Sequence, residues 1–274
     1  MSEASPSTFL ARNEFLIRRL HSLSGMIPVG AYMVVHLLTN ATVLDSPASF
    51  QKNVYSIHSL GVILPLVEWV FIFLPILFHA IVGVLIVRGS LPNNSTYKYT
   101  SNLRYTLQRA TGMIAFAFIM WHVFHMHGWF HADAWLNSIS SLGGGMFRPY
   151  NAASSGSEAM RASMPIVPIL YAIGVLSCVF HLANGIWTFG ITWGIWVTPQ
   201  AQRWATVACL IFGIGLGIVG MSALAGFAFV VDPAKAKLAE DKMYESKTAS
   251  GELAPNEHKR AHDTKHAAAP SPQP

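Results

Sequence analysis

The sequence has little charge: Asp, Glu, Lys and Arg make up 11% of its 274 residues, against about 25% in a soluble domain. It has only two cysteines, Cys178 and Cys209, and both lie within apolar runs, which argues against a disulfide or a zinc site. It lacks a basic stripe interleaved with aromatic residues, so its formal net charge of +5 does not indicate nucleic-acid binding. Residues 1–13 are polar, so we do not expect a cleavable signal peptide there. These absences point away from a soluble or nucleic-acid-binding protein.

Long apolar runs lie between the few charged segments, and five of them are long enough to cross a bilayer. They predict an all-α integral membrane protein with five transmembrane helices, at residues 22–43, 62–87, 111–130, 164–189 and 205–231. The chain then divides into a cytoplasmic N-terminal segment (1–21), a transmembrane domain (22–231) and a disordered external tail (232–274) rich in Ala, Lys, Glu, His and Pro. Residues 137–163 are expected to form a long external loop.

Basic residues collect in alternate loops, which predicts the orientation. They lie before the first run, between the second and third, and between the fourth and fifth: Arg12, Arg18, Arg19, Arg88, Lys98, Arg104, Arg109 and Arg203. Cytoplasmic loops carry such an excess of Lys and Arg. We therefore expect a multi-pass protein of the inner (cytoplasmic) cell membrane, with the N-terminus in the cytoplasm and the C-terminus outside.

Four of the predicted spans each carry a histidine well inside: His36, His79, His122 and His181. A histidine inside the membrane needs a partner, and a single one could simply hydrogen-bond to a neighbouring helix. At 1.5 Å per residue, His36 lies roughly 25 Å beyond Arg19 and His122 roughly 20 Å beyond Arg109, whereas His79 and His181 lie within roughly 13 Å of the cytoplasmic ends. The histidines therefore form an outer pair and an inner pair.

An internal repeat links the same pairs. The first span contains LHSLSGMI before His36, and the third contains LQRATGMI before His122. Phe78–His79 is followed by Gly83, as Phe180–His181 is followed by Gly185, and each glycine would leave a flat helix face against which a porphyrin could lie.

Two histidines at one depth on different helices suit the two axial positions of a haem iron. We therefore predict that the first four helices form a di-haem bundle, with His36 and His122 on the outer haem iron and His79 and His181 on the inner one. His125, one turn from His122, is the main rival ligand.

Other polar residues are weaker candidates. Arg19, His21, Ser22, Gln108 and Arg109 gather at the cytoplasmic ends of the first and third spans, where they could contact haem propionates or simply anchor the helices. Glu68 is the only carboxylate inside the predicted spans, near the outer end of the second. It could transfer protons beside a quinone or be an interfacial residue in water.

These motifs, together with VVHLLTN, FLPILFHAIVG and FHLANGIWTFGITWGIWVTP, resemble the cytochrome b558 subunit of bacterial succinate dehydrogenase and the related fumarate reductases, over residues 14–231. The resemblance implies a membrane anchor with two haem b groups. Its partners would be a flavoprotein subunit and an iron–sulfur subunit, and its electrons would reduce a quinone, usually menaquinone. The flavin and succinate sites would then lie outside this chain, which is enzymatic only within the complex. The same ligand assignment is implied, with His79 and His181 nearer the iron–sulfur subunit.

Two other functions fit part of the pattern. One is the di-haem cytochrome of another quinone-linked dehydrogenase, which different co-purifying subunits would reveal. The other is a haem-free transporter that uses its buried histidines for protons and would show no Soret absorbance. Paired unwound helices, which are typical of many transporters, are not indicated.

Overall fold

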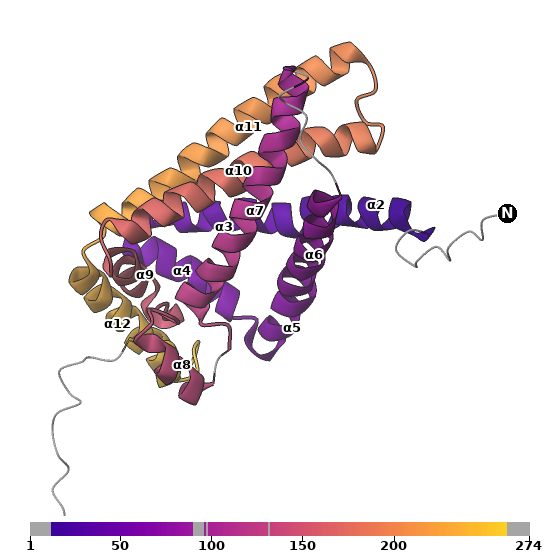
Figure 1. The fold of residues 1–274 in the computed structure, drawn as a ribbon. Helices are drawn as coiled ribbons and strands as arrows, with labels where there is room; N and C mark the ends of the chain where they lie inside the picture. The colour runs from indigo at the N-terminus through magenta and orange to yellow at the C-terminus, as the bar shows by residue number, and fades with distance from the viewer. Residues whose placement is uncertain (1–11, 90–95, 97, 131, 262–274) are drawn as a thin grey trace, which may run out of the picture.

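The computed structural model describes residues 12–89, 96, 98–130 and 132–261, and these residues form helices and no strand. The helices that run along the bundle are α2 (Glu14–Ser24), α3 (Ala31–Ala41), α5 (Leu64–Glu68), α6 (Leu74–Arg88), α7 (Thr100–His127), α10 (Ile166–Thr192) and α11 (Pro199–Ala225). Shorter helices lie at one end: α4 (Pro47–His58), α8 (Asp133–Ser140), α9 (Ala152–Arg161) and α12 (Pro233–Ala249). Figure 1 shows α7 lying across α10 and α11, with α9, α4 and α12 below them.

Four continuous helical segments are long and apolar enough to cross a membrane: Glu14–Leu44, Gly61–Arg88, Ile166–Thr192 and Pro199–Val230. They correspond to four of the five predicted spans. The fifth prediction falls on α7, which has 28 residues. Two arginines and three histidines in α7 lower its hydropathy, so this helix does not meet the same criterion. The first helix begins at Glu14, about two turns before residue 22, where the first span is predicted to begin.

A π-helical turn, η1 (Gly25–Gly30), joins α2 to α3 and contains Pro28. This turn explains an irregularity in the internal repeat. His36 lies eleven positions after Gly25, but His122 lies ten positions after Gly112. A π turn bonds residue i to i+5 and so contains one residue more than an α turn. The extra residue of the first copy is thereby absorbed, and both histidines keep the same rotational phase relative to the motif glycine.

Helices α4, α9 and α12, with residues 250–261, pack together as a small unit that we call the cap. The end of the bundle that it covers is the capped end, and the opposite end, where α2 begins and α6 ends, is the open end (Figure 1). The apolar core of the cap contains Phe50, Ala153 and Ala236. It also contains Val43, just after α3, and Phe227, just after α11. The cap and the capped end of the bundle therefore share one hydrophobic core.

The expectation of a disordered tail from residue 232 is wrong for residues 232–261. Asp232 caps α12 by accepting hydrogen bonds from the backbone N–H groups of Ala234 and Lys235, and Pro233 occupies the first turn. Ala236, Glu240 and Tyr244 follow one another at four-residue intervals and form the buried face. Residues 262–274 lie outside the described part of the chain.

Residues 137–163 also differ from the predicted loop, because α9 is almost wholly buried. Two side chains from distant segments satisfy its first backbone N–H groups. Gln51 accepts from Ala152 at 2.8 Å, and Glu240 accepts from Ala153 at 2.6 Å and from the Ser154 hydroxyl at 2.5 Å. Buried donors at a helix start require such partners. The helix is thus held in place by α4 and α12.

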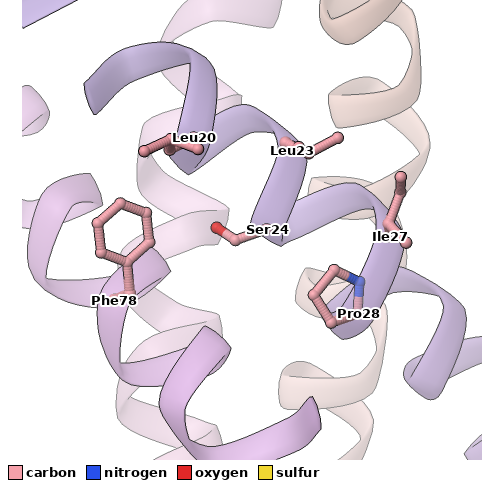
Figure 2. Close-up of a pocket in the computed structure, with 6 residues that line it drawn as sticks. All are labelled: Leu20, Leu23, Ser24, Ile27, Pro28 and Phe78. Carbon is pink, nitrogen blue, oxygen red and sulfur yellow. The ribbon is translucent and has the colours of Figure 1, made fainter. Parts of the chain in front are cut away.

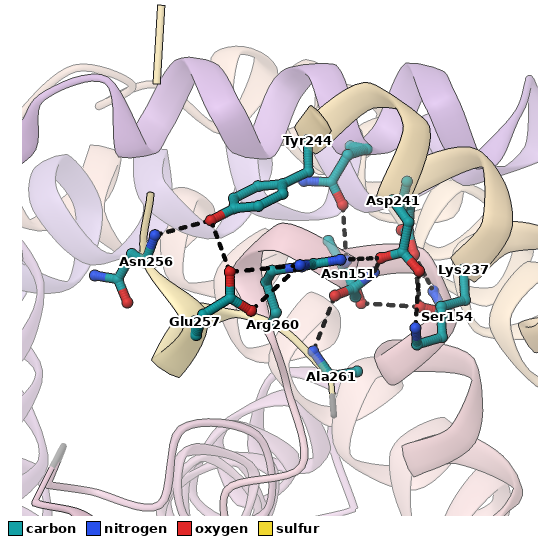
Figure 3. A network of polar contacts seen from close by, with 12 residues as sticks. Asn151, Ser154, Lys237, Asp241, Tyr244, Asn256, Glu257, Arg260 and Ala261 are labelled. Carbon is teal, nitrogen blue, oxygen red and sulfur yellow. Dashed lines mark hydrogen bonds and ion pairs between the residues drawn. The ribbon is translucent and has the colours of Figure 1, made fainter. Parts of the chain in front are cut away.

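A polar network ties the end of the described chain to the cap (Figure 3). Asp241 accepts from Asn151 at 2.9 Å and pairs with Lys237 at 2.8 Å and Arg260 at 3.0 Å. The backbone N–H of Ala261 donates to the Asn151 side chain at 2.9 Å. Because one carboxylate serves two cations and an amide, residues 250–261 are fixed to α9 and α12.

Candidate functional site

The four histidines of the predicted spans meet in two pairs. The rings of His36 and His122 have centroids 5.9 Å apart and planes at 76°. Those of His79 and His181 have centroids 6.1 Å apart and planes at 84°. His36 and His122 each lie five residues before the capped end of their helix, so we call them the capped-end pair. His79 and His181 form the open-end pair, because Arg88 and Thr192 end their helices at the open end.

The spacing within each pair fits one metal between two imidazoles. With metal–nitrogen bonds of about 2.0–2.1 Å on opposite sides of the metal, two ring centroids lie roughly 6 Å apart. Both observed separations, 5.9 Å and 6.1 Å, agree with this value. No group of three or more His, Cys, Asp or Glu suited to a metal ion occurs in the described residues. Each pair offers two imidazole rings, the number that the two axial positions of one metal take.

Backbone carbonyl groups fix the outward nitrogen of each open-end ring. Nδ1 of His79 lies 2.9 Å from the carbonyl oxygen of His21, and Nδ1 of His181 lies 3.0 Å from that of Gln108. A carbonyl oxygen only accepts, so each Nδ1 carries a proton and each Nε2 is left with a free lone pair. Histidine ligands of metals commonly donate their second N–H in this way. His21 and Gln108 occupy matching positions of the internal repeat.

The glycines of the repeat make room for these rings. A Cβ on Gly25 would overlap Cε1 of His79 and lie 2.6 Å from its Nδ1, and a Cβ on Gly112 would lie 2.7 Å from Cε1 of His181. Real Cβ atoms do not approach so closely, so each position requires glycine.

Gly83 and Gly185, which we expected to face a porphyrin, lie instead beside the side chains of His21 and Gln108. A Cβ at these positions would be 3.3 Å and 3.6 Å, respectively, from the side-chain nitrogen Nε2. The flat face predicted at each of the two glycines therefore receives a protein side chain.

A buried polar network supports the open-end pair. The Gln108 side chain donates to the carbonyl oxygen of His181 at 3.1 Å and accepts from Asn184 at 2.8 Å. Asn184 in turn accepts from Arg104 at 2.9 Å, and the Arg104 guanidinium stacks on Trp187 at 3.9 Å. Together these contacts lock α7 to α10 beside His181.

The capped-end pair is supported by a side chain. The Tyr171 hydroxyl lies 3.1 Å from Nδ1 of His122 and 2.9 Å from Nδ1 of His125. Tyr171 and His125 are both buried. The ring of His125 stacks on Trp121 at 5.0 Å and 8°, and that of His122 stacks on Phe118 at 5.7 Å and 26°. Within the described residues His36 makes a ring contact with His122 and none with His125, which favours His122 over its rival.

The remaining predicted residues do not form one cluster. Arg19 donates a short hydrogen bond to the Thr192 carbonyl at the end of α10 and lies 5.2 Å from the ring centre of Trp193. Arg109 lies over the ring of Tyr105, and no side-chain hydrogen bond of Ser22 is found in the described residues. The His21 ring stacks on that of His79, with centroids 4.1 Å apart. Only His21 and Gln108 of this group thus lie against the histidine pairs.

Glu68 is the last residue of α5 and is half-buried at the capped end. Lys259, from the segment that follows α12, is close enough for a charge interaction with it. Lys259 also lies 3.5 Å from Nδ1 of His58 and 5.5 Å from the ring centre of Tyr150. The end of the described chain therefore reaches the surroundings of Glu68, which the expectation of a disordered tail did not include.

An apolar pocket lies between α2 and α6, beside the open-end pair. Figure 2 shows its lining: Leu20, Leu23, Ser24, Ile27, Pro28 and Phe78. The Ser24 hydroxyl donates to the carbonyl oxygen of His21 at 3.0 Å, so the only polar side chain of the pocket is already bonded. The lining is suited to hydrocarbon and not to a polar ligand.

Sequence reasoning missed Tyr171 and the role of Gly25 and Gly112. Both glycines stand in the repeat, and a pair of glycines at matching positions could have suggested close approach. Tyr171 lies ten residues before His181 and shares no motif with either histidine pair. The only available signal was a tyrosine hydroxyl inside an apolar run, which usually requires a partner.

No protein-family model matches the chain. A curated protein does: the chain is 38% identical over 223 residues to the succinate dehydrogenase cytochrome b558 subunit of Bacillus subtilis (strain 168). The match covers 79% of this chain and 98% of that protein. On this similarity, spanning nearly the whole relative, the chain belongs to the family of succinate dehydrogenase cytochrome b558 subunits.

Proposed function

We propose that this chain is the membrane-anchor cytochrome b subunit of a succinate:quinone oxidoreductase and that it holds two haem b groups. His36 and His122 are the iron ligands at the capped end, and His79 and His181 are those at the open end. The observation that carries the proposal is the spacing of about 6 Å within each pair, the distance at which two imidazoles share one metal. The family membership supports haem b as the cofactor.

The haems, when bound, supply one-electron transfer between an iron–sulfur partner at the open end and a quinone at the capped end. The chain provides position and environment. The carbonyl groups of His21 and Gln108 orient the open-end rings, and the glycines of the repeat let the helices approach. His21, Ser22, Arg19, Gln108 and Arg109 lie toward the open end and are candidates for propionate contacts. His21 and Gln108 are the strongest, because they lie closest to the open-end pair.

The open end is cytoplasmic in this proposal, and α7 is the fifth membrane-crossing helix. At 1.5 Å per residue, its 28 residues span roughly 42 Å, enough for a bilayer. The basic residues before and within α2, at the end of α6, in α7 and near the start of α11 support the orientation. A flavoprotein subunit and an iron–sulfur subunit bind at this end, and succinate and flavin chemistry belongs to them. The cap and residues 232–261 lie on the outer side.

The quinone, for which menaquinone is the proposed species, is reduced near the capped-end pair. Glu68 is the candidate proton-transfer group because it is the carboxylate of the second membrane segment and lies eleven residues, about three turns, before His79. Its neighbour Lys259 offers a positive charge near that position.

The test begins with the purified complex. A pyridine haemochromogen assay with a reduced-minus-oxidised spectrum is expected to give two b haems per chain. His36→Ala and His122→Ala should each remove the same haem and stop quinone reduction, while succinate oxidation with an artificial dye persists. His58→Ala, in α4 beside Tyr150, serves as the control and should retain both haems.

Three results would contradict the proposal. A folded complex without haem would favour the transporter function. Different co-purifying subunits would favour another quinone-linked dehydrogenase. Retention of both haems in His36→Ala and His122→Ala would refute the ligand assignment.

A further inference from the structure

The hydrogen bonds around the capped-end pair form a chain of three groups that does not follow from the family membership. The Tyr171 hydroxyl stands between Nδ1 of His122, at 3.1 Å, and Nδ1 of His125, at 2.9 Å. The three side chains come from two helices, α7 and α10. Tyr171 is 6% exposed and His125 is 3% exposed, so neither can exchange this partner for water.

A hydroxyl group has a single proton, and this fixes the direction of the chain once one end is known. A histidine that binds iron through Nε2 carries its proton on Nδ1 and must donate there. Nδ1 of His122 then donates to the Tyr171 oxygen, and the Tyr171 proton is left to point at Nδ1 of His125. His125 therefore accepts at Nδ1 and is neutral, with its proton on Nε2.

We infer that Tyr171 is the positioning residue of the capped-end haem ligand: its oxygen accepts the Nδ1 proton of His122 and its hydroxyl proton holds His125 away from the iron. The inference rests on the proposed ligand assignment and goes beyond it. It explains why two histidines one turn apart differ in role. His125 is held by Tyr171 and by the stacked Trp121 ring, while His122 turns toward His36.

The acceptor also affects the iron. A ligand histidine that donates its second N–H is more basic and a stronger donor to the metal, which favours the oxidised iron. Replacing the Tyr171 hydroxyl by hydrogen removes this acceptor. The midpoint potential of the capped-end haem should then move to a more positive value, whereas the open-end haem, bound through His79 and His181, should not change.

The experiment is a potentiometric titration of the intact complex with Tyr171→Phe, followed by optical and low-spin EPR spectra. The two haems are told apart by the signal that disappears in His122→Ala. The matched control is Tyr32→Phe, because the Tyr32 ring lies 5.5 Å from that of His36 but forms no hydrogen bond with either pair in the described residues. We expect two haems in both variants, a positive shift of the capped-end haem alone in Tyr171→Phe, and no shift in Tyr32→Phe.

A second pair of variants keeps the test decisive if Tyr171→Phe does not assemble. Fluorotyrosine at position 171 preserves the shape and weakens the oxygen as an acceptor, so it should give a smaller shift in the same direction. His125→Phe retains a ring on Trp121 and should keep both haems.

Two results would overturn the inference. One is an unchanged capped-end potential and EPR signal in both Tyr171 variants, which would leave the di-haem proposal intact. The other is loss of a haem in His125→Phe together with its retention in His122→Ala, which would reverse the two histidine roles. Absence of haem from the wild-type complex is a separate outcome that refutes the proposed function itself and, with it, this inference.

Discussion

Replacing Gly25 by alanine adds only a methyl group, but we expect it to change the haem content of the complex. The Cβ of Gly25→Ala would lie 2.6 Å from Nδ1 of His79, whereas non-bonded heavy atoms rest at about 3.5–4.0 Å. The ring must therefore move by about 1 Å. Metal ligands tolerate about 0.2 Å, and Nδ1 of His79 is also bonded to the His21 carbonyl. We expect the open-end haem to be lost from the complex.

Gly112→Ala should act on the same haem from its other side, because its Cβ would lie 2.7 Å from Cε1 of His181. The matched control is Gly215→Ala in α11, where a Cβ meets no atom within 4 Å. The measurement is haem per chain by the pyridine haemochromogen method. We expect two haems in the control and one in each of the other variants. Two haems with unchanged spectra in Gly25→Ala would refute the role given to this glycine and weaken the assignment of His79.

Three further predictions concern the polar networks. Asn184→Ala should leave Arg104 and Gln108 without their buried partner and cost about 1–3 kcal/mol, measured as a lower melting temperature of the complex; an unchanged melting temperature would contradict it. Burial raises the pKa of Glu240 from 4.5 to about 7, so the cap should lose about 3 kcal/mol of stability as the pH rises through this window. The melting temperature of Glu240→Gln should not change with pH between 4.5 and about 7. An equal dependence of the melting temperature on pH in variant and wild type would exclude Glu240 as the cause. Ending the chain at residue 231 should expose α9 to limited proteolysis, because Ala153 and Ser154 lose their acceptor; wild-type protection would show that the cap folds without α12.

The sequence allowed the histidine pairs to be predicted because their positions follow two simple periodicities. Depth along a helix and the internal repeat depend only on residue counts, and the structure brings together the pairs that both indicated. The four apolar segments were found for the same reason, since length and composition decide them. The haem ligation itself remains a prediction.

The cap could not be predicted because its stability comes from contacts between distant segments. Glu240 bonds to α9 residues 86 and 87 positions away, and Gln51 bonds to Ala152, 101 positions away. The buried face of α12 consists of Ala236, Glu240 and Tyr244, which shows no apolar periodicity. The role of Tyr171 could not be predicted for the same reason, because its two hydrogen-bond partners lie 46 and 49 residues away on another helix.

The two histidine pairs differ in whether a single substitution can remove the hydrogen-bond acceptor of Nδ1. At the open end the acceptors of Nδ1 are backbone oxygens of residues 21 and 108, and a backbone oxygen is present whatever amino acid stands there. At the capped end the acceptor is the hydroxyl of Tyr171, which one nucleotide change could remove. Under the proposed assignment, natural variation can therefore adjust the haem near the quinone by single substitutions. The haem that receives electrons from the partner subunits is shielded from the same kind of change.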